Sequence, residues 1–428
     1  MIASNWGVGA MRMNRFRSQT AGAIGSVLEW YDFAIFGFLA PFMGPLFFPD
    51  ADPVVALIQT YGIFAAGYLM RPLGGVLFGY IADRLGRTRA LRWSIAMMAA
   101  PTVLVGLLPT YENVGAAAAA MLIGLRLIQG VSVGGELTTS ITFLVEAAPA
   151  HRRGLHGSWA LFGAVGGILL GSAVVAGIES LISASAMQDY GWRIPFVMSI
   201  VIFLFGRWLR RALADQPVTA AHSDKAPLRV VLTGHLAGVL HLMSCMLLYC
   251  GGFYTLFVWM PTYQSKVIPN PVSHAMDINT LAMIALVILL PIGGLLGDRL
   301  GFRRVLLGGI ALTGIAVYPL FLWIDTGSFV GALVSGLVFA VAISWVQGPM
   351  PALLAETFPR EIRNTGVGVA YNLAMGLFGG TAPMVCTWLI DVSGDVAAPA
   401  YYLLALAIIS AIALATFRPR GATALGQG

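Results

Sequence analysis

The chain has 428 residues, of which 58% are hydrophobic and 10% are charged, and its formal net charge is +6. A soluble domain carries about 25% charged residues, so this composition excludes a soluble globular protein. Apolar stretches long enough to cross a bilayer recur along the whole sequence, and a buried helix of a soluble protein would account for one of them but not for a dozen.

The hydropathy pattern predicts an all-α membrane protein with twelve transmembrane helices. We expect them at residues 20–47, 54–82, 92–110, 115–146, 155–182, 193–212, 231–263, 277–297, 304–324, 328–356, 363–391 and 398–417. The first stretch contains Glu29 and Asp32 and has no small-residue cleavage site after it. We therefore interpret it as a membrane helix and not as a removable signal peptide.

Basic residues predict the orientation of these helices, because loops rich in Arg and Lys stay in the cytoplasm. Such residues precede the first predicted helix and then follow every second one, whereas the opposite loops are mainly acidic. Both termini are therefore expected to be cytoplasmic. This distribution also accounts for the net charge, so no nucleic-acid partner is expected. The basic positions are Arg12, Arg15, Arg17, Arg84, Arg87, Arg89, Arg92, Arg152, Arg153, Arg210, Arg211, Lys225, Arg229, Arg299, Arg303, Arg304, Arg360, Arg363, Arg418 and Arg420.

Two short motifs occur twice in the chain. Gly79, Asp83 and Gly86 recur as Gly294, Asp298 and Gly301 at an offset of 215 residues, and the triplet Glu146, Pro149, Arg153 recurs as Glu356, Pro359, Arg363 at an offset of 210. The chain is therefore expected to contain two copies of a unit of roughly 200 residues, the internal symmetry of secondary transporters. We predict an N-terminal bundle at 1–211, a cytoplasmic linker at 212–232 and a C-terminal bundle at 233–428.

The doubled loop and the twelve-helix layout resemble the major facilitator superfamily. Four further motifs look like its metabolite:proton symporter branch, whose members carry citrate, α-ketoglutarate, shikimate, or proline with betaine. These motifs are Glu29-Trp-Tyr-Asp32-Phe, Arg71-Pro-Leu-Gly-Gly, Arg126-x2-Gln129-Gly-x-Ser-x-Gly-Gly135-Glu136 and Gly191-Trp-Arg193-Ile-Pro-Phe. The second half looks closest to the citrate-type members. Phe302 stands where the family's second loop usually has Arg, so looser contacts are expected there.

The repeated charged motifs are interpreted as a cytoplasmic gate. Asp83 and Asp298 end predicted helices, where each can meet the positive end of a neighbouring helix. The pairs Glu146 with Arg153 and Glu356 with Arg363 flank the next cytoplasmic loops and are expected to join the same clusters. The alternative is that such residues only mark topology and bind lipid headgroups, which we prefer for Arg89, Arg92, Arg304 and Arg360. The predicted gate consists of Asp83, Arg84, Arg87, Glu146, Arg153, Asp298, Arg299, Glu356 and Arg363.

Charged residues inside the predicted helices point to proton coupling, because each is costly in a bilayer unless it is paired or hydrated. Glu29 and Asp32 are three residues apart and share a helix face. Two such close carboxylates disfavour joint ionisation, so one can carry a proton. Glu136, ten residues after Arg126 and about 15 Å along that helix, is a candidate relay. For Glu29 and Glu136 a structural hydrogen bond is the alternative.

Polar residues in the helix interiors are candidates for substrate binding. In the resembling fold the first and fourth helices line one cavity, so Arg126 is expected either to bind a substrate carboxylate or to pair with Asp32. Arg71 lies deep in the second helix, where it faces either the path or a packed neighbour. The full set is Arg126, Gln129, Tyr254, Gln347, Tyr371, Asn372 and Arg71.

These residues predict a proton-coupled symporter of the inner (plasma) membrane that imports a small organic acid, such as a di- or tricarboxylate, by alternating access. The alternative is a zwitterionic osmolyte such as proline or betaine, whose cationic head would meet Asp32 and aromatic rings. The absence of a coiled coil after Arg420 weakens a role in osmosensing. Drug efflux and a non-transporting receptor are less favoured.

An enzyme is not expected, because no nucleophile, metal cluster or cofactor loop stands out. Cys245, Cys250 and Cys386 lie in apolar runs without metal spacing. We therefore predict no cofactor and no metal. The expected partners are the small-molecule substrate, protons and membrane lipid, and the chain is expected to be a monomer.

Overall fold

The computed structural model describes residues 26–27, 29–85, 87–133, 136–213, 227–359 and 361–417, and every regular element within them is helical. The first-half elements are the span Glu29–Phe47, α2 (Pro53–Leu69), α3 (Arg71–Leu85), α4 (Arg87–Leu107), α5 (Tyr111–Val114), α6 (Ala117–Ser132), α7 (Glu136–Glu146), the 3₁₀ turn η1 (Ala150–Arg152), α8 (Arg153–Leu181), α9 (Ala184–Ala186), the π-helical η2 (Met187–Gly191) and α10 (Arg193–Leu213).

The second half repeats this pattern with more interruptions. Its elements are α11 (Pro227–Gly234), α12 (Leu236–Cys245), the π-helical η3 (Leu248–Gly252) and η4 (Tyr254–Trp259), α13 (Met260–Thr262), the π-helical η5 (Tyr263–Val267), α14 (Ala275–Leu300), α15 (Phe302–Asp325), α16 (Phe329–Gln347), α17 (Met350–Thr357), α18 (Arg363–Ala374), the π-helical η6 (Met375–Gly380), α19 (Ala382–Ser393) and α20 (Ala398–Thr416).

Within the described residues, ten helical stretches are long and apolar enough to cross a membrane. Helices α4 and α10 occupy the third and sixth predicted positions and complete the set of twelve. The prediction of an all-α membrane protein is confirmed. The boundaries of the linker and of the two bundles stay a prediction, since residues 214–226 lie outside the described part of the chain.

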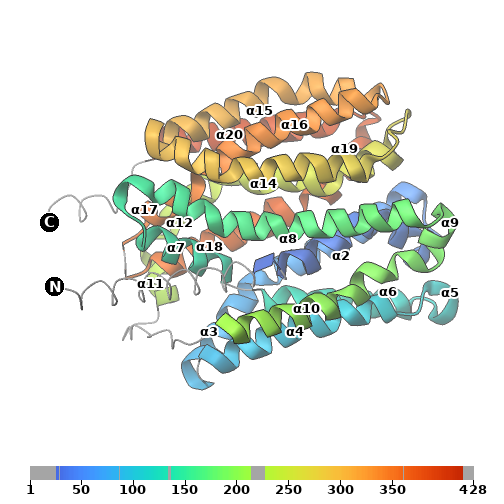
Figure 1. Cartoon of the computed structure of the whole chain (residues 1–428), viewed down its shortest axis with the longest axis horizontal. Helices are drawn as coiled ribbons and strands as arrows, with labels where there is room; N and C mark the ends of the chain where they lie inside the picture. The colour runs from blue at the N-terminus through green and yellow to red at the C-terminus, as the bar shows by residue number, and fades with distance from the viewer. Residues whose placement is uncertain are drawn as a thin grey trace, which may run out of the picture.

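The helices of the two halves lie in two groups (Figure 1). Helices α14, α15, α16 and α20 form one group, and α2, α4, α6 and α10 form the other. The groups meet along two seams: α8 runs beside α14, and α2 packs against η6 and α19. A seam between two bundles is where rocking transporters bind their substrates.

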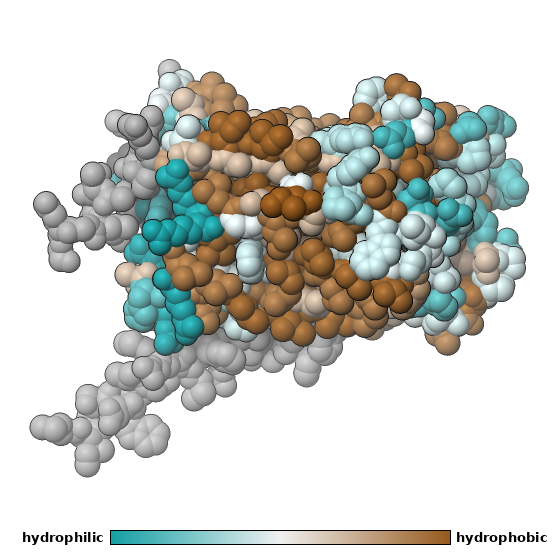
Figure 2. Space-filling model, turned by 90° about the horizontal axis from the view of Figure 1, so that it is seen from above, coloured by the Kyte–Doolittle hydropathy of each residue, from teal (hydrophilic) through white to brown (hydrophobic). Residues whose placement is uncertain are grey.

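The surface carries the pattern that a bilayer requires. Figure 2 shows a band of hydrophobic residues between two ends where hydrophilic residues gather. Large apolar side chains such as Ile315, Ile412 and Ile288 are 78%, 61% and 59% exposed. In water this would be costly, but hydrocarbon solvates such a belt. We call the end that contains Arg153, Arg299 and Arg363 the arginine-rich end.

Several spans are broken near their middle. The second span is interrupted at Met70, so α3 begins with Arg71 and Pro72. The seventh and eleventh spans contain the π-helical segments η3, η4 and η6. Proline and π-helical turns disturb the regular hydrogen-bond ladder, and such breaks are common at functional sites in membrane helices.

Candidate functional site

Two arginines, Arg71 and Arg126, are buried where the second and fourth spans cross. Arg71 is 2% exposed and Arg126 is 0% exposed. Gly67 and Gly130 make this crossing possible, because a Cβ atom on Gly130 would collide with the carbonyl oxygen of Gly67. The guanidinium of Arg126 lies against Gly67, with Nε and Nη2 3.7 Å from the position of a Cβ atom there. The close crossing therefore places the Arg126 guanidinium beside Gly67, which precedes Arg71 by one helical turn.

The side chain of Arg126 is held on one edge only. Its Nη1 donates to Oε1 of Gln129 at 2.9 Å. Among the described residues, its Nε and Nη2 have no hydrogen-bond partner. The guanidinium lies over three rings of the first half, with centroids 4.3 to 5.5 Å from Cζ, which belong to Phe36, Phe33 and Phe64. Arg126 thus has two buried N–H groups that can donate hydrogen bonds to a carboxylate.

The surroundings of Arg71 differ from those of Arg126. Its Nη2 lies 4.0 Å from Oε1 of Glu29, at the limit of an ion pair. Nε and Nη1 of Arg71 lack a hydrogen-bond partner in the part of the chain that is described. Its Cζ lies 5.1 to 6.0 Å from the centroids of four aromatic rings, three in the first half and one in the second. These rings belong to Trp30, Tyr68, Phe33 and Tyr371.

The Asp32 carboxylate is buried on the same helix as Glu29 but faces other partners. It is 7% exposed, and its Oδ1 accepts a hydrogen bond from the Ser199 hydroxyl at 2.7 Å. The Thr102 side chain lies beside it and accepts from Nε2 of Gln129 at 2.7 Å. Since Gln129 also binds Arg126, polar contacts connect the acid to the buried guanidinium without joining them directly.

This arrangement differs from the predicted one in two ways. No ion pair joins Asp32 to Arg126 among the described residues, so the alternative in which they pair directly is wrong for this structure. Glu29 and Asp32 have separate partners, on α3 and α10, because successive positions of one helix face can reach different neighbours. The side chain of Glu136 lies outside the described residues.

The predicted second-half residues are also buried at this level. The hydroxyl groups of Tyr254 and Tyr68 share a hydrogen bond of 2.5 Å across the seam between the halves. Nε2 of Gln347 lies 3.5 Å from the carbonyl oxygen of Tyr249, and its Oε1 has no partner among the described atoms. Asn372 is 5% exposed. We call Arg71, Arg126, Glu29, Asp32, Gln129, Gln347 and the surrounding aromatic rings the central cluster.

Several residues that contact the central cluster were not predicted from the sequence. Tyr68 precedes Arg71 by three residues, and that one-turn spacing is a signal that was available. Phe64 precedes Tyr68 by a further turn. Ser199 and Thr102 gave no signal, because a single hydroxyl in an apolar helix usually bonds to its own backbone.

At the arginine-rich end, Asp298 binds the first turn of α8. Its Oδ1 accepts from the backbone N–H of Gly154 at 2.7 Å, and its Oδ2 accepts from that of Leu155 at 2.9 Å. Gly294 allows this approach, because a Cβ atom on it would lie 2.5 Å from the carbonyl oxygen of Gly154. The carboxylate therefore caps the positive end of a helix from the other half. The Phe302 ring packs against Gly154, so the apolar replacement fills this contact.

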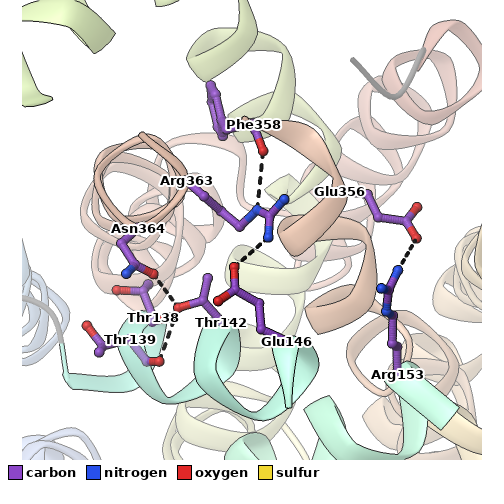
Figure 3. A network of polar contacts seen from close by, with 9 residues as sticks. All are labelled: Thr138, Thr139, Thr142, Glu146, Arg153, Glu356, Phe358, Arg363 and Asn364. Atoms are coloured by element: carbon purple, nitrogen blue, oxygen red, sulfur yellow. Dashed lines mark hydrogen bonds and ion pairs between the residues drawn. The ribbon is translucent and has the colours of Figure 1, made fainter. Parts of the chain in front are cut away.

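The repeated Glu and Arg residues form two ion pairs that cross between the halves (Figure 3). Glu146 binds Arg363 at 2.5 Å, and Arg153 lies 4.0 Å from Glu356. The sequence did not predict which Glu binds which Arg, and in the structure each Arg lies beside the equivalent Glu of the other half. Next to the first pair, Thr142 and Asn364 share a further hydrogen bond across the seam.

The structure describes fewer side chains in the first copy of the charged loop, at residues 79–89, than in the second. The side chains of Asp83 and Arg87 lie outside the described residues. Arg84 is exposed, with its Cζ 4.9 Å from the Tyr80 ring centroid, and Arg299 is exposed as well. Among the described residues, no group of three or more His, Cys, Asp or Glu side chains has the arrangement of a metal site.

The sequence matches two family models. Residues 19–217 match the model described as Sugar (and other) transporter, and residues 270–426 match the Major Facilitator Superfamily. The fold is similar to that of the xylose transporter XylE from E. coli in its partially occluded inward open conformation. That comparison has a TM-score of 0.73 at 19% identity and covers 94% of this chain and 98% of the other.

Curated relatives are similar over most of their length. A Proline/betaine transporter of Salmonella typhimurium is 34% identical over 409 residues, which cover 92% of this chain and 81% of the relative. One of Escherichia coli (strain K12) is 34% identical over 93% of this chain and 82% of the relative. The Glycine betaine/proline/ectoine/pipecolic acid transporter OusA of Dickeya dadantii is 35% identical, with coverages of 91% and 80%.

These relatives and the shared fold are those of transporters and not of enzymes. The chain therefore belongs to the major facilitator superfamily and, with its proline/betaine transporter relatives, to the metabolite:proton symporter family, as a multi-pass protein of the inner membrane.

Proposed function

We propose that this chain is a proton-coupled symporter that takes up a small zwitterion of the proline and betaine type by alternating access. The names of the relatives support this substrate class. The observation that carries the proposal is the charge balance of the central cluster. Two acidic side chains, Glu29 and Asp32, face two basic ones, Arg71 and Arg126, among aromatic rings.

The balance argues against the organic acid that the sequence first suggested. An unbalanced charge inside a membrane helix costs about 3 kcal/mol on insertion scales. A di- or tricarboxylate would bring two or three negative charges to a cluster whose formal charges already cancel. A zwitterion adds no net charge and still supplies partners for both kinds of group. The relatives described above are likewise named for proline and betaine.

The two ends of a zwitterion find different partners here. Its carboxylate can accept from Nε and Nη2 of Arg126, which have no hydrogen-bond partner among the described residues. Its ammonium suits the aromatic faces around Arg71, where a cation already lies within 6.0 Å of four ring centroids. The proposal thus gives each substrate charge a compensating group.

Asp32 is the proposed proton carrier. It is buried, and its Oδ1 accepts a hydrogen bond from the hydroxyl group of Ser199, which carries no charge, so the negative charge of Asp32 is poorly compensated. Protonation from outside would remove that charge and leave the cluster with a net positive charge, which attracts a carboxylate. The loaded halves would then rock, the contacts at the arginine-rich end would part, and proton and substrate would leave inward.

A thermal-shift series on purified protein tests the substrate class. Ligands that bind only the folded state raise the melting temperature. We expect betaine and proline to raise it, and citrate and α-ketoglutarate to leave it unchanged. Arg126→Gln should abolish the shift with betaine. A shift with citrate but none with betaine or proline would overturn the zwitterion assignment in favour of an organic acid.

A second experiment tests the proton carrier in proteoliposomes. Asp32→Asn mimics a permanently protonated carboxyl group, so betaine exchange between the two sides should continue while accumulation driven by a pH gradient is lost. Asp391→Asn is the matched control, because Asp391 is exposed on another span. If Asp32→Asn accumulates betaine as the parent does, the proton site lies elsewhere.

A further inference from the structure

We infer that Arg71 is a built-in competitor for the aromatic cage that holds the substrate's ammonium, and that a cation enters this cage only when a carboxylate draws Arg71 out of it. The inference rests on the proposed function and adds the reason why such a site would select zwitterions. We call Trp30, Phe33, Tyr68 and Tyr371 the aromatic cage.

The geometry of the cage is that of a cation site. The Cζ atom of Arg71 lies 5.1 Å from the ring centroid of Trp30, 5.4 Å from that of Tyr68, 5.8 Å from that of Phe33 and 6.0 Å from that of Tyr371. Rings at these distances attract a cation through their quadrupoles, and Trp does so most strongly. A guanidinium and a methylated ammonium are cations of similar size, so the same rings can hold either.

Arg71 is weakly tied to this place. Its Nη2 forms an ion pair with Oε1 of Glu29 at a distance of 4.0 Å, the limit for such a contact. Nε and Nη1 have no hydrogen-bond partner in the described residues although the side chain is 2% exposed. Buried donors of this kind are costly, and a substrate carboxylate would satisfy them. Both guanidinium groups lie near the Phe33 ring, so a carboxylate that accepts from Arg126 can also accept from Arg71 and draw its guanidinium out while the ammonium takes its place among the rings.

Arg126 is buried among aromatic rings as well, but it differs from Arg71 in two ways that make it the natural control. Its Nη1 is fixed by Gln129 at 2.9 Å, and the rings around it, Phe33, Phe36 and Phe64, all belong to the first half. The aromatic cage of Arg71 includes Tyr371 of α18 and so spans both halves. A ligand in that cage contacts both halves, as a substrate of a rocking transporter must.

The consequence is selectivity for zwitterions over simple cations. Choline shares the trimethylammonium head of betaine but has no carboxylate, so nothing draws Arg71 away and two cations would compete for one cage. Betaine carries both groups and exchanges one cation for another without a net change of charge. The competitor therefore excludes choline even though the aromatic rings suit it.

The test is a set of affinities measured by calorimetry on purified protein. The parent should bind betaine and not choline. Arg71→Met removes the competitor with little loss of volume, so choline binding should appear with a gain of roughly tenfold or more, while betaine binding weakens. Arg126→Met should weaken betaine binding without any gain for choline. Arg71→Met that binds betaine like the parent and still excludes choline would overturn the inference.

A measurement on the parent alone keeps the inference testable if the variant does not fold. Acetate supplies a separate carboxylate that can draw out Arg71, so choline should bind in the presence of saturating acetate. Sodium chloride at equal concentration is the control. No effect of acetate on choline binding would overturn the inference even if betaine binds. A parent that binds neither betaine nor proline would instead overturn the proposed function itself.

Discussion

The two ion pairs at the arginine-rich end are built from two copies of one sequence motif but differ in structure. Glu146 and Arg363 are 2.5 Å apart, with the Arg363 side chain 6% exposed and the Glu146 side chain 46% exposed. Arg153 and Glu356 are 4.0 Å apart, with side chains 24% and 30% exposed. In an intact twofold repeat the pairs would be equivalent. We therefore expect the first pair to contribute more than the second to the gate proposed for this end.

Local packing explains why the first pair is tighter. Nε of Arg363 also donates to the carbonyl oxygen of Phe358 at 3.2 Å, which fixes the guanidinium in place. Thr142 and Asn364 share a hydrogen bond beside it. Arg153 has no comparable second anchor among the described residues, since its Nε lacks a hydrogen-bond partner. A pair preorganised in this way costs less entropy to form.

The strongest test of this difference is charge reversal. Glu146→Arg places a second cation beside the buried Arg363 guanidinium and should open this end of the transporter. Leaving a buried charge uncompensated costs about 3 kcal/mol, so betaine uptake into proteoliposomes should fall by roughly 100-fold. The double variant Glu146→Arg with Arg363→Glu should restore most of the uptake.

Glu356→Arg is the matched reversal in the looser pair and should lower uptake by less than tenfold, because both of its partners are partly exposed to solvent and solvent-screened pairs contribute about 0 to 1 kcal/mol. Equal losses in the two reversals would show that the geometric difference has no energetic counterpart.

A change at the helix crossing should affect both pairs at once. Gly294→Ala puts a Cβ atom against the backbone of Gly154 and separates α14 from α8. Overpacking of this kind costs about 1 to 3 kcal/mol, so uptake should fall roughly tenfold and the melting temperature should drop. Gly166→Ala on α8 is the control, because nothing lies within 4 Å of its Cβ position. A stable, fully active Gly294→Ala variant would contradict the role of this crossing.

The smallest effect is expected from neutralising the looser pair. Glu356→Gln keeps the shape and removes the charge, so uptake should change by about twofold or less. Uptake by the Glu146→Gln variant should fall further than uptake by Glu356→Gln. The loss in Glu146→Gln should also depend less on added salt, since Arg363, the partner of Glu146, is buried. A larger loss in Glu356→Gln than in Glu146→Gln would reverse the proposed ranking.

At the arginine-rich end, the sequence predicted which residues take part more accurately than it predicted which residues bind each other. The repeat singled out Asp298 and Gly294, because the motif places both at fixed positions on one helix. It could not predict that Glu146 would bind Arg363, since that contact joins residues 217 positions apart and depends on how the halves dock. A repeat specifies residue types in each copy, whereas the pairing across copies is set by tertiary packing.

The same limit applies to the central cluster. The contact between Arg126 and Gln129 follows from a spacing of three residues on one helix. The place of Arg71 could not be decided, because its rings come from the first, second and eleventh spans. Ser199 is 167 positions from Asp32 and carries no sequence signal for that contact.

The most direct test of the account is whether betaine carries protons with it. Betaine added outside weakly buffered proteoliposomes should raise the external pH as protons enter with the substrate. The Asp32→Asn variant should exchange betaine without any such change in pH. Betaine uptake by the parent with no movement of protons, or proton movement that persists in Asp32→Asn, would contradict the proposed coupling through Asp32.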